Sequence, residues 1–200
     1  MQKKIVIFEG FGSAGKTTLI EKLKKDLDSE FKIEILDNKH PKYASILFSD
    51  NEVTSLSKSK YLHFCSRWMR LYLFFDFIIN SDSDLFFFGR GILTNYIYGN
   101  ADHVPEYMID ELINDFLSFI EEKNIIYKTV FIDCDLEIAN SRCKHRENID
   151  VNRKIKRNEL FASYYLKNIS EYYFIKDLAI INTSNSIFEE YEKLIQFIKE

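Results

Sequence analysis

Residues 4–18 read KIVIFEGFGSAGKTT, and this stretch decides the fold of the chain. It opens with an apolar run and continues through three of the chain's six glycines, which are followed by Lys16 and Thr17. A short, fully apolar run bounded by glycine predicts a buried strand, and the leucines at positions 19, 23 and 27 have helical spacing. The stretch therefore predicts a strand that turns through glycines into a helix.

The glycines match a known anion-binding pattern. Residues 10–17 fit the phosphate-binding loop G-x-x-x-x-G-K-[ST], between a strand and a helix as that pattern requires. Lys16 would reach the β- and γ-phosphates of a nucleotide, and the hydroxyl group of Thr17 would help to bind Mg²⁺. Backbone N–H groups would surround a phosphate at the positive end of the helix. We therefore expect ATP and Mg²⁺ to bind at Gly10, Gly12, Ser13, Ala14, Gly15, Lys16, Thr17 and Thr18.

Composition limits the other classes of protein. The chain has 200 residues, 46% of them hydrophobic, which is enough for one domain spanning residues 1–200. Its 27 Lys and Arg against 31 Asp and Glu give a net charge of −4, which argues against binding nucleic acid or a membrane surface through bulk charge. The three cysteines lack the paired spacing of a zinc site, and the apolar run at residues 71–79 is far shorter than the ~20 residues that span a bilayer. These features predict a cytoplasmic protein with free thiols.

Strand-like and helical segments alternate along the chain. Apolar runs of strand length recur at residues 32–36, 84–88, 128–132 and 178–181, and longer stretches with helical spacing, such as residues 109–120, lie between them. Strands that are apolar throughout and separated by helices are typical of a parallel sheet covered on both faces. The pattern predicts a doubly wound α/β domain with a parallel sheet of about five strands.

Three further stretches, together with residues 4–18, resemble one family. They are YLHFCSRW (61–68), FFFGRGILTNYIYG (86–99) and IDCDLEIANSRCKHR (132–146). In these motifs the chain resembles the thymidylate kinase family, a branch of the nucleoside monophosphate kinases that lies close to the deoxynucleoside kinases. The resemblance implies a P-loop nucleotide kinase fold, ATP with Mg²⁺, and a small-molecule nucleotide as the acceptor of the phosphoryl group.

The resemblance also assigns roles at the acceptor site. Arg67 would hydrogen-bond the acceptor base, although a surface ion pair is an alternative for a lone helical arginine. Arg90, at the end of the third strand, would bind the acceptor phosphate with its forked guanidinium group. Thr94 and Tyr98 would shape the floor of the site. His63 stands where the family stacks a phenylalanine on the base.

A basic segment at about residues 142–157 would form a lid over the phosphates. It contains seven Lys and Arg against two acidic residues in a chain that is acidic overall. Arg142 and Arg146 are one helical turn apart and could point at the same phosphates, stabilising the charge that develops during transfer. For Lys154 and Lys156 a solvated helix face is the alternative.

Two carboxylates of the family pattern are missing. Gly12 and Gly89 occupy positions where the family usually has Asp; the carboxylates that remain near strand ends are Glu9, Asp37, Asp133 and Asp135. Three functions therefore stay open: a kinase of thymidylate or a related pyrimidine monophosphate, a deoxynucleoside kinase with Asp37 as its base, and a non-catalytic nucleotide-binding protein. Phosphorylating a hydroxyl group benefits from a base, whereas a phosphate acceptor is already anionic.

The sequence finally suggests a second copy of the chain as a partner. The long apolar helix expected at residues 56–79 carries Leu71, Phe74, Phe75 and Ile78, which exceed what one core-facing stripe needs. By resemblance to the family this helix would form a twofold homodimer.

Overall fold

The computed structural model describes residues 2–37, 60–145, 150–165, 169–184 and 188–200. These residues form a parallel five-stranded sheet in the order β2-β3-β1-β4-β5, as expected for a doubly wound domain. Each expected strand is present within two residues of its predicted ends. The strands are β1 (Lys4–Gly10), β2 (Ile33–Leu36), β3 (Leu85–Phe88), β4 (Ile126–Asp133) and β5 (Leu178–Asn182).

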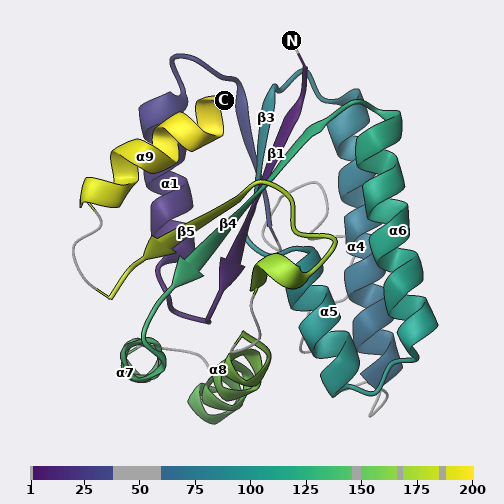
Figure 1. Ribbon diagram of the computed structural model, residues 1–200, viewed down its shortest axis with the longest axis vertical. Helices are drawn as coiled ribbons and strands as arrows, with labels where there is room; N and C mark the ends of the chain where they lie inside the picture. Colours follow the sequence, from purple (N-terminus) through teal and green to yellow (C-terminus); the bar gives the residue numbers. More distant parts are fainter. Residues whose placement is uncertain (1, 38–59, 146–149, 166–168, 185–187) are drawn as a thin grey trace.

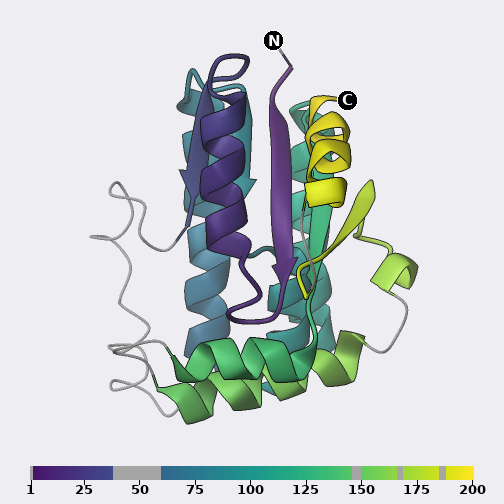
Figure 2. The same ribbon diagram turned by 90° about the vertical axis from the view of Figure 1, so that its left-hand side faces the viewer.

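Helices cover both faces of this sheet (Figure 1). On one face lie α1 (Lys16–Leu27) and α9 (Phe188–Lys199), and on the other lie α4 (Lys60–Asn80), α5 (Ile92–Ala101) and α6 (Glu106–Glu122). Figure 2 shows α7 (Leu136–Lys144) and α8 (Val151–Tyr165) side by side across the carboxyl ends of the strands. A short 3₁₀ helix, η1 (Ile169–Glu171), precedes β5. The carboxyl edge of the sheet, where open α/β folds bind ligands, thus lies next to α7 and α8.

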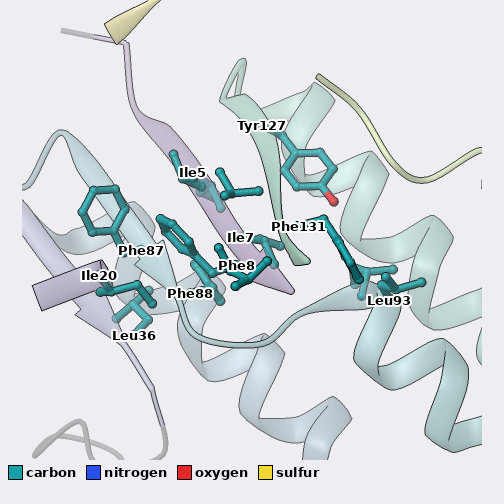
Figure 3. Packing of buried hydrophobic residues seen from close by; sticks show 14 of the residues in the cluster. Ile5, Ile7, Phe8, Ile20, Leu36, Phe87, Phe88, Leu93, Tyr127 and Phe131 are labelled. Carbon is teal, nitrogen blue, oxygen red and sulfur yellow. The ribbon is translucent and has the colours of Figure 1, made fainter. Parts of the chain in front are cut away.

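The core is formed by strand side chains that alternate between the two faces. In the parallel register Ile5 pairs with Phe86 and Val6 with Phe87, so these four side chains point alternately to each helix layer. Figure 3 shows Phe87 beside Ile20 and Leu36 on one side of the sheet, and Phe131 beside Leu93 on the other. Because both faces are covered, the strands are apolar at most positions, which is what made them recognisable in the sequence.

Two lysines inside these strands cap a helix. The ammonium group of Lys4 lies 2.5 Å from the carbonyl oxygen of Ile198 and 3.0 Å from that of Lys199, and Lys128 Nζ lies 2.7 Å from the carbonyl oxygen of Phe197. They satisfy carbonyl groups in the last turn of α9 and complement its dipole. Burial, and then the neighbouring charge of Lys128, lower the pKa of Lys4.

The expectation that α4 carries more apolar residues than its own core needs is wrong. Leu71, Phe74, Phe75 and Ile78 are all buried in the core of their own chain, where Phe75 stacks on Phe119 at 4.0 Å between ring centroids. The core absorbs them because α4 packs against both the sheet and α6. Among the side chains of α4 that the structure describes, from residue 64 onward, the large apolar ones that stay exposed are Met69, Tyr72 and Ile79. Among the described helices, α4 included, none is long and apolar enough to cross a membrane.

Candidate active site

The phosphate-binding loop leads from β1 into α1 as expected. Gly10 has φ 129°, and a Cβ atom there would lie 2.4 Å from the carbonyl oxygen of Ile132, so glycine is required. Gly15 precedes α1 with φ 95° and has open space where a side chain would stand. No side chain caps this helix N-terminus. The backbone N–H groups of the first turn are therefore available to an anion.

Lys16 and Thr17 lie on this loop in positions that fit a bound nucleotide. The ammonium group of Lys16 lies over its own loop, 2.8 Å from the carbonyl oxygen of Gly10 and 2.5 Å from that of Phe11. Thr17 is exposed at the start of α1. The described residues contain no group of three or more His, Cys, Asp or Glu side chains arranged to hold a metal ion. Magnesium held mainly by phosphates, water and one hydroxyl group needs no such group, so the loop fits ATP with Mg²⁺.

Glu9, at the end of β1, connects the loop to the segment after β3. Its carboxylate is completely buried and accepts hydrogen bonds from the backbone N–H groups of Gly91 (2.9 Å) and Thr94 (3.2 Å). It also accepts one from the hydroxyl group of Thr94 at 2.5 Å. Burial raises the pKa of Glu9, whereas these hydrogen bonds and the charges of Arg90 and Lys16 oppose that rise. Glu9 thus fixes the backbone that directly follows Arg90.

Three arginines of the described chain converge on Tyr98. Arg90 Nη1 donates a 3.3 Å hydrogen bond to its hydroxyl group. The guanidinium carbons of Arg67 and Arg157 each lie 5.5 Å from its ring centroid, within the range of a cation–π contact. Arg67 also forms the ion pair that the sequence left open as an alternative, with Nη2 3.8 Å from the carboxylate of Asp102. The three guanidinium groups thus gather at one place, and Arg90 Nη2 would lie 3.9 Å from a Cβ atom on Gly12 of the loop.

Other predicted acceptor residues are arranged differently from expectation. Thr94 is buried, with its hydroxyl group bonded to Glu9, so it supports the site from below rather than lining its floor. Asp37 directly follows β2, whose Leu36 pairs with Phe88 of β3, so it lies at the same sheet edge as Gly89. His63 lies in α4, but its side chain is outside the described residues.

The structure describes one of the two predicted lid arginines, Arg142. Arg142 donates to the carbonyl oxygen of Thr183 at 3.0 Å and lies 3.6 Å from Cys134 Sγ, so its guanidinium group is held against the end of β5. Thr183 in turn donates a hydrogen bond to the carbonyl oxygen of Ala14 at 2.9 Å. Arg142 is thereby held close to the phosphate-binding loop, which is called the donor loop below. Arg146 lies outside the described residues. The expected common aim of both side chains at the phosphates therefore remains a prediction.

The helix α8 presents a basic pocket and an unexpected contact. The pocket has a volume of about 460 Å³. It is lined by Asp150, Asn152, Arg153, Lys156, Arg157 and Leu160. Asn158, on the same helix, is buried and hydrogen-bonded to Gly12 of the loop. Nothing in the sequence around Asn158 indicated this contact, because its partner is 146 residues away.

A phosphate-binding loop after the central strand of a parallel sheet, beneath two helices with basic side chains, is the arrangement of the P-loop nucleotide kinases, and the chain has that fold. Its structure matches that of "deoxyadenosine kinase from M. mycoides with bound dATP" with a TM-score of 0.58 and 13% identity, over 98% of this chain and 100% of that one. Its sequence is 26% identical over 204 residues to the "Probable thymidylate kinase 1" of Saccharolobus solfataricus, covering 97% of each chain. No protein-family model matches. The resemblance expected from the sequence is confirmed as a similarity to P-loop nucleotide kinases.

Proposed function

We propose that the chain is an ATP- and Mg²⁺-dependent kinase that phosphorylates a nucleoside monophosphate, either thymidylate or a related pyrimidine monophosphate. The observation that carries the proposal is the convergence of Arg67, Arg90 and Arg157 on Tyr98. Guanidinium groups gathered around one ring attract an anionic acceptor, and Asp102 forms an ion pair with one of them, Arg67. Charge-assisted, two-pronged contacts from guanidinium to phosphate are stronger than contacts to a neutral hydroxyl group.

The chain's own residues divide into a donor half and an acceptor half. The loop N–H groups, Lys16 and Thr17 hold the triphosphate and its metal ion, and bound ATP supplies the phosphoryl group. Arg90 binds and orients the acceptor phosphate, and Arg67 contacts the base, as the resemblance to thymidylate kinases implies. An acceptor phosphate oxygen is already anionic, so no strong general base is required. Catalysis then rests on positioning and on positive charge around the transferred group.

A second candidate is a deoxynucleoside kinase. One observation favours it: Asp37 lies at the carboxyl end of β2, beside the Gly89–Arg90 segment, where a base for a sugar hydroxyl group would be useful. The fold is also shared with a protein whose name states that it acts on deoxyadenosine. Gly12 and Gly89 lack the carboxylates that the family usually has at these positions. For either class of acceptor we therefore expect weaker discrimination between different sugars than in the family.

The deciding experiment offers the purified chain ATP, Mg²⁺ and, one at a time, thymidine, deoxycytidine, deoxyadenosine and the monophosphates of thymidine, uridine and deoxyuridine. The products are separated by ion-exchange chromatography. We expect diphosphates from the pyrimidine monophosphates and loss of that activity in Arg90→Ala. If nucleosides alone are phosphorylated, the second candidate is correct and Asp37→Asn should abolish turnover. If ATP binds but no acceptor is phosphorylated, the chain is a nucleotide-binding protein without this activity.

A further inference from the structure

The side-chain amide of Asn158 in α8 pairs with both backbone polar groups of Gly12 in the loop. Asn158 Oδ1 accepts a hydrogen bond from the N–H of Gly12 at 2.7 Å, and its Nδ2 donates to the carbonyl oxygen of Gly12 at 3.2 Å. The second N–H of the same group donates to Asn140 Oδ1 in α7 at 3.0 Å. Asn158 is 2% exposed, and its amide oxygen and both of its N–H groups have partners inside the protein.

The absence of a side chain at position 12 is what makes this contact possible. A Cβ atom on Gly12 would lie 3.0 Å from Asn158 Oδ1, which is tighter than ordinary Cβ contacts, so the amide would have to shift by a few tenths of an ångström. Gly12 does not have a positive φ, so the backbone itself does not require glycine there. Gly89 is the opposite case, because a Cβ atom on it would meet nothing within 4 Å. The two departures from the family pattern therefore have different structural meanings.

The neighbour of Asn158 reaches the other half of the site. Arg157 precedes Asn158 in α8, and its guanidinium carbon lies 5.5 Å from the ring centroid of Tyr98. The same helix thus contacts the phosphate-binding loop through Asn158 and reaches Tyr98 through the residue before it. In α7, Cys143 is also buried against the loop, with Sγ 3.2 Å from Ser13 Oγ. Both helices therefore contact the loop at the same place, beside Gly12 and Ser13.

We infer that Asn158 is a positioning residue that fastens α8 to the phosphate-binding loop, and that Gly12 is the partner this contact requires. The amide takes the space beside the loop that a carboxylate at position 12 would need. Its consequence for turnover rests on the proposed kinase function: with the contact intact, Arg157 is held in register with the donor loop and Tyr98. Without this contact, α8 and its basic residues are no longer fixed relative to the loop, while Lys16 and Thr17 keep their positions.

The contact itself is tested by a double-mutant cycle in thermal unfolding, which needs no activity. The variants are Gly12→Ala, Asn158→Ala and the pair, with Gly89→Ala as the matched control. We expect Gly12→Ala to lower the unfolding midpoint by about 2–4 °C in the wild-type background and to change it by less than about 1 °C once Asn158 is alanine. Gly89→Ala should have little effect in either background. Additive effects of the two substitutions would overturn the inference.

The positioning role is tested by kinetics with Asn158→Ala and Asn158→Asp. The aspartate variant has the same shape as wild type, but it turns an acceptor oxygen toward two other acceptors, Gly12 O and Asn140 Oδ1, so it should lose the contact without leaving a cavity. We expect both variants to lower kcat at least about tenfold, with KM for ATP within about threefold of wild type. Wild-type kcat in Asn158→Asp would contradict the positioning role. Absence of transfer in the wild-type chain would count against the proposed function instead, and the unfolding cycle would still decide the contact.

Discussion

The hydroxyl group of Thr94 lies 2.5 Å from Glu9 Oε2 and donates a hydrogen bond to it in the interior of the protein. Glu9 Oε1 accepts from the N–H groups of Gly91 and Thr94, so the carboxylate at the end of β1 caps the first turn of α5. Gly91 itself provides no side-chain cap to this helix. A strand that carries the donor loop and a helix that follows Arg90 are thereby joined through one buried acidic group.

Replacing Thr94 by valine should destabilise the fold and loosen Arg90. The variant keeps the shape of the side chain but leaves one oxygen of a buried carboxyl group without its donor, which costs about 1–3 kcal/mol in the free energy of unfolding. Thr94→Ser retains the hydroxyl group and should lose clearly less. Urea unfolding of both variants measures the difference. Equal losses would mean that the methyl group, and not the hydrogen bond, matters at this position.

The titration of Glu9 should be visible in the pH dependence of stability. Burial raises its pKa in the folded protein above the value of about 4.3 in an unfolded chain. A raised folded pKa means that the group's contribution to stability is present below the unfolded pKa and is lost as the pH rises through the folded pKa. Glu9→Gln cannot ionise and should keep that contribution. The stability of Glu9→Gln relative to wild type, measured by urea unfolding from pH 4 to pH 8, should therefore increase with pH, and a decrease would refute the assignment.

Lys16 should be indispensable for transfer. Its ammonium group lies against the carbonyl oxygens of Gly10 and Phe11, within the phosphate-binding loop itself. Lys16→Ala should reduce turnover by at least about 100-fold, because a positioned charge that stabilises the transferred phosphoryl group is worth roughly that much. Lys22→Ala, on the exposed side of the same helix and paired with Asp26, serves as the control and should retain turnover. Unchanged turnover in Lys16→Ala would remove the kinase assignment.

The expected homodimer can be tested on the residues that α4 leaves exposed. Met69, Tyr72 and Ile79 lie on one stripe of the helix and are 59%, 44% and 50% exposed. If a second copy covers this stripe, light scattering should give twice the chain mass of 23.8 kDa, and Met69→Lys should shift the protein toward the monomer. Tyr107→Lys, which changes an even more exposed apolar residue on α6, should leave the mass unchanged. A wild-type mass of one chain would contradict the dimer.

The sheet was predictable because its determinants are local. A strand buried on both faces is apolar at most positions, and each such run is bounded by residues that break it. The roles of Lys4 and Lys128 were not predictable in the same way. A lysine inside an apolar run gives no sign of which helix end it will reach, and the carbonyl groups that these two cap belong to α9, at the opposite end of the sequence.

In the candidate site, the phosphate-binding loop could be predicted from local sequence, whereas the contacts that support it could not. The donor loop is contiguous, so ten residues were enough to predict its place between β1 and α1. The supports of the site are tertiary contacts: Glu9 with Thr94, and Asn158 with Gly12. The residues that make both contacts are of common types, and no motif in the surrounding sequence marks them. The contacts become visible once the chain is folded. The resemblance to thymidylate kinases could mark Gly12 as a departure, but the folded chain is needed to relate that departure to Asn158.

The position of Arg157 over Tyr98 leads to a prediction that separates specific from general charge in α8. Arg157 contacts the same ring as Arg67, whereas Lys156, one residue earlier, is exposed and was open to interpretation as a solvated charge. If the cluster binds the acceptor phosphate, Arg157→Ala should raise KM for the monophosphate about tenfold, equivalent to about 1.4 kcal/mol of lost binding, and Lys156→Ala should change it by less than about twofold. Steady-state rates with the monophosphate varied at saturating ATP measure both. Repeating them at high salt removes the long-range part of each effect, because exposed charges are screened beyond about 10 Å already at 0.1 M ionic strength. Equal effects of the two substitutions would show that α8 acts through its total charge, and the contact of Arg157 with Tyr98 would then have no role in acceptor binding.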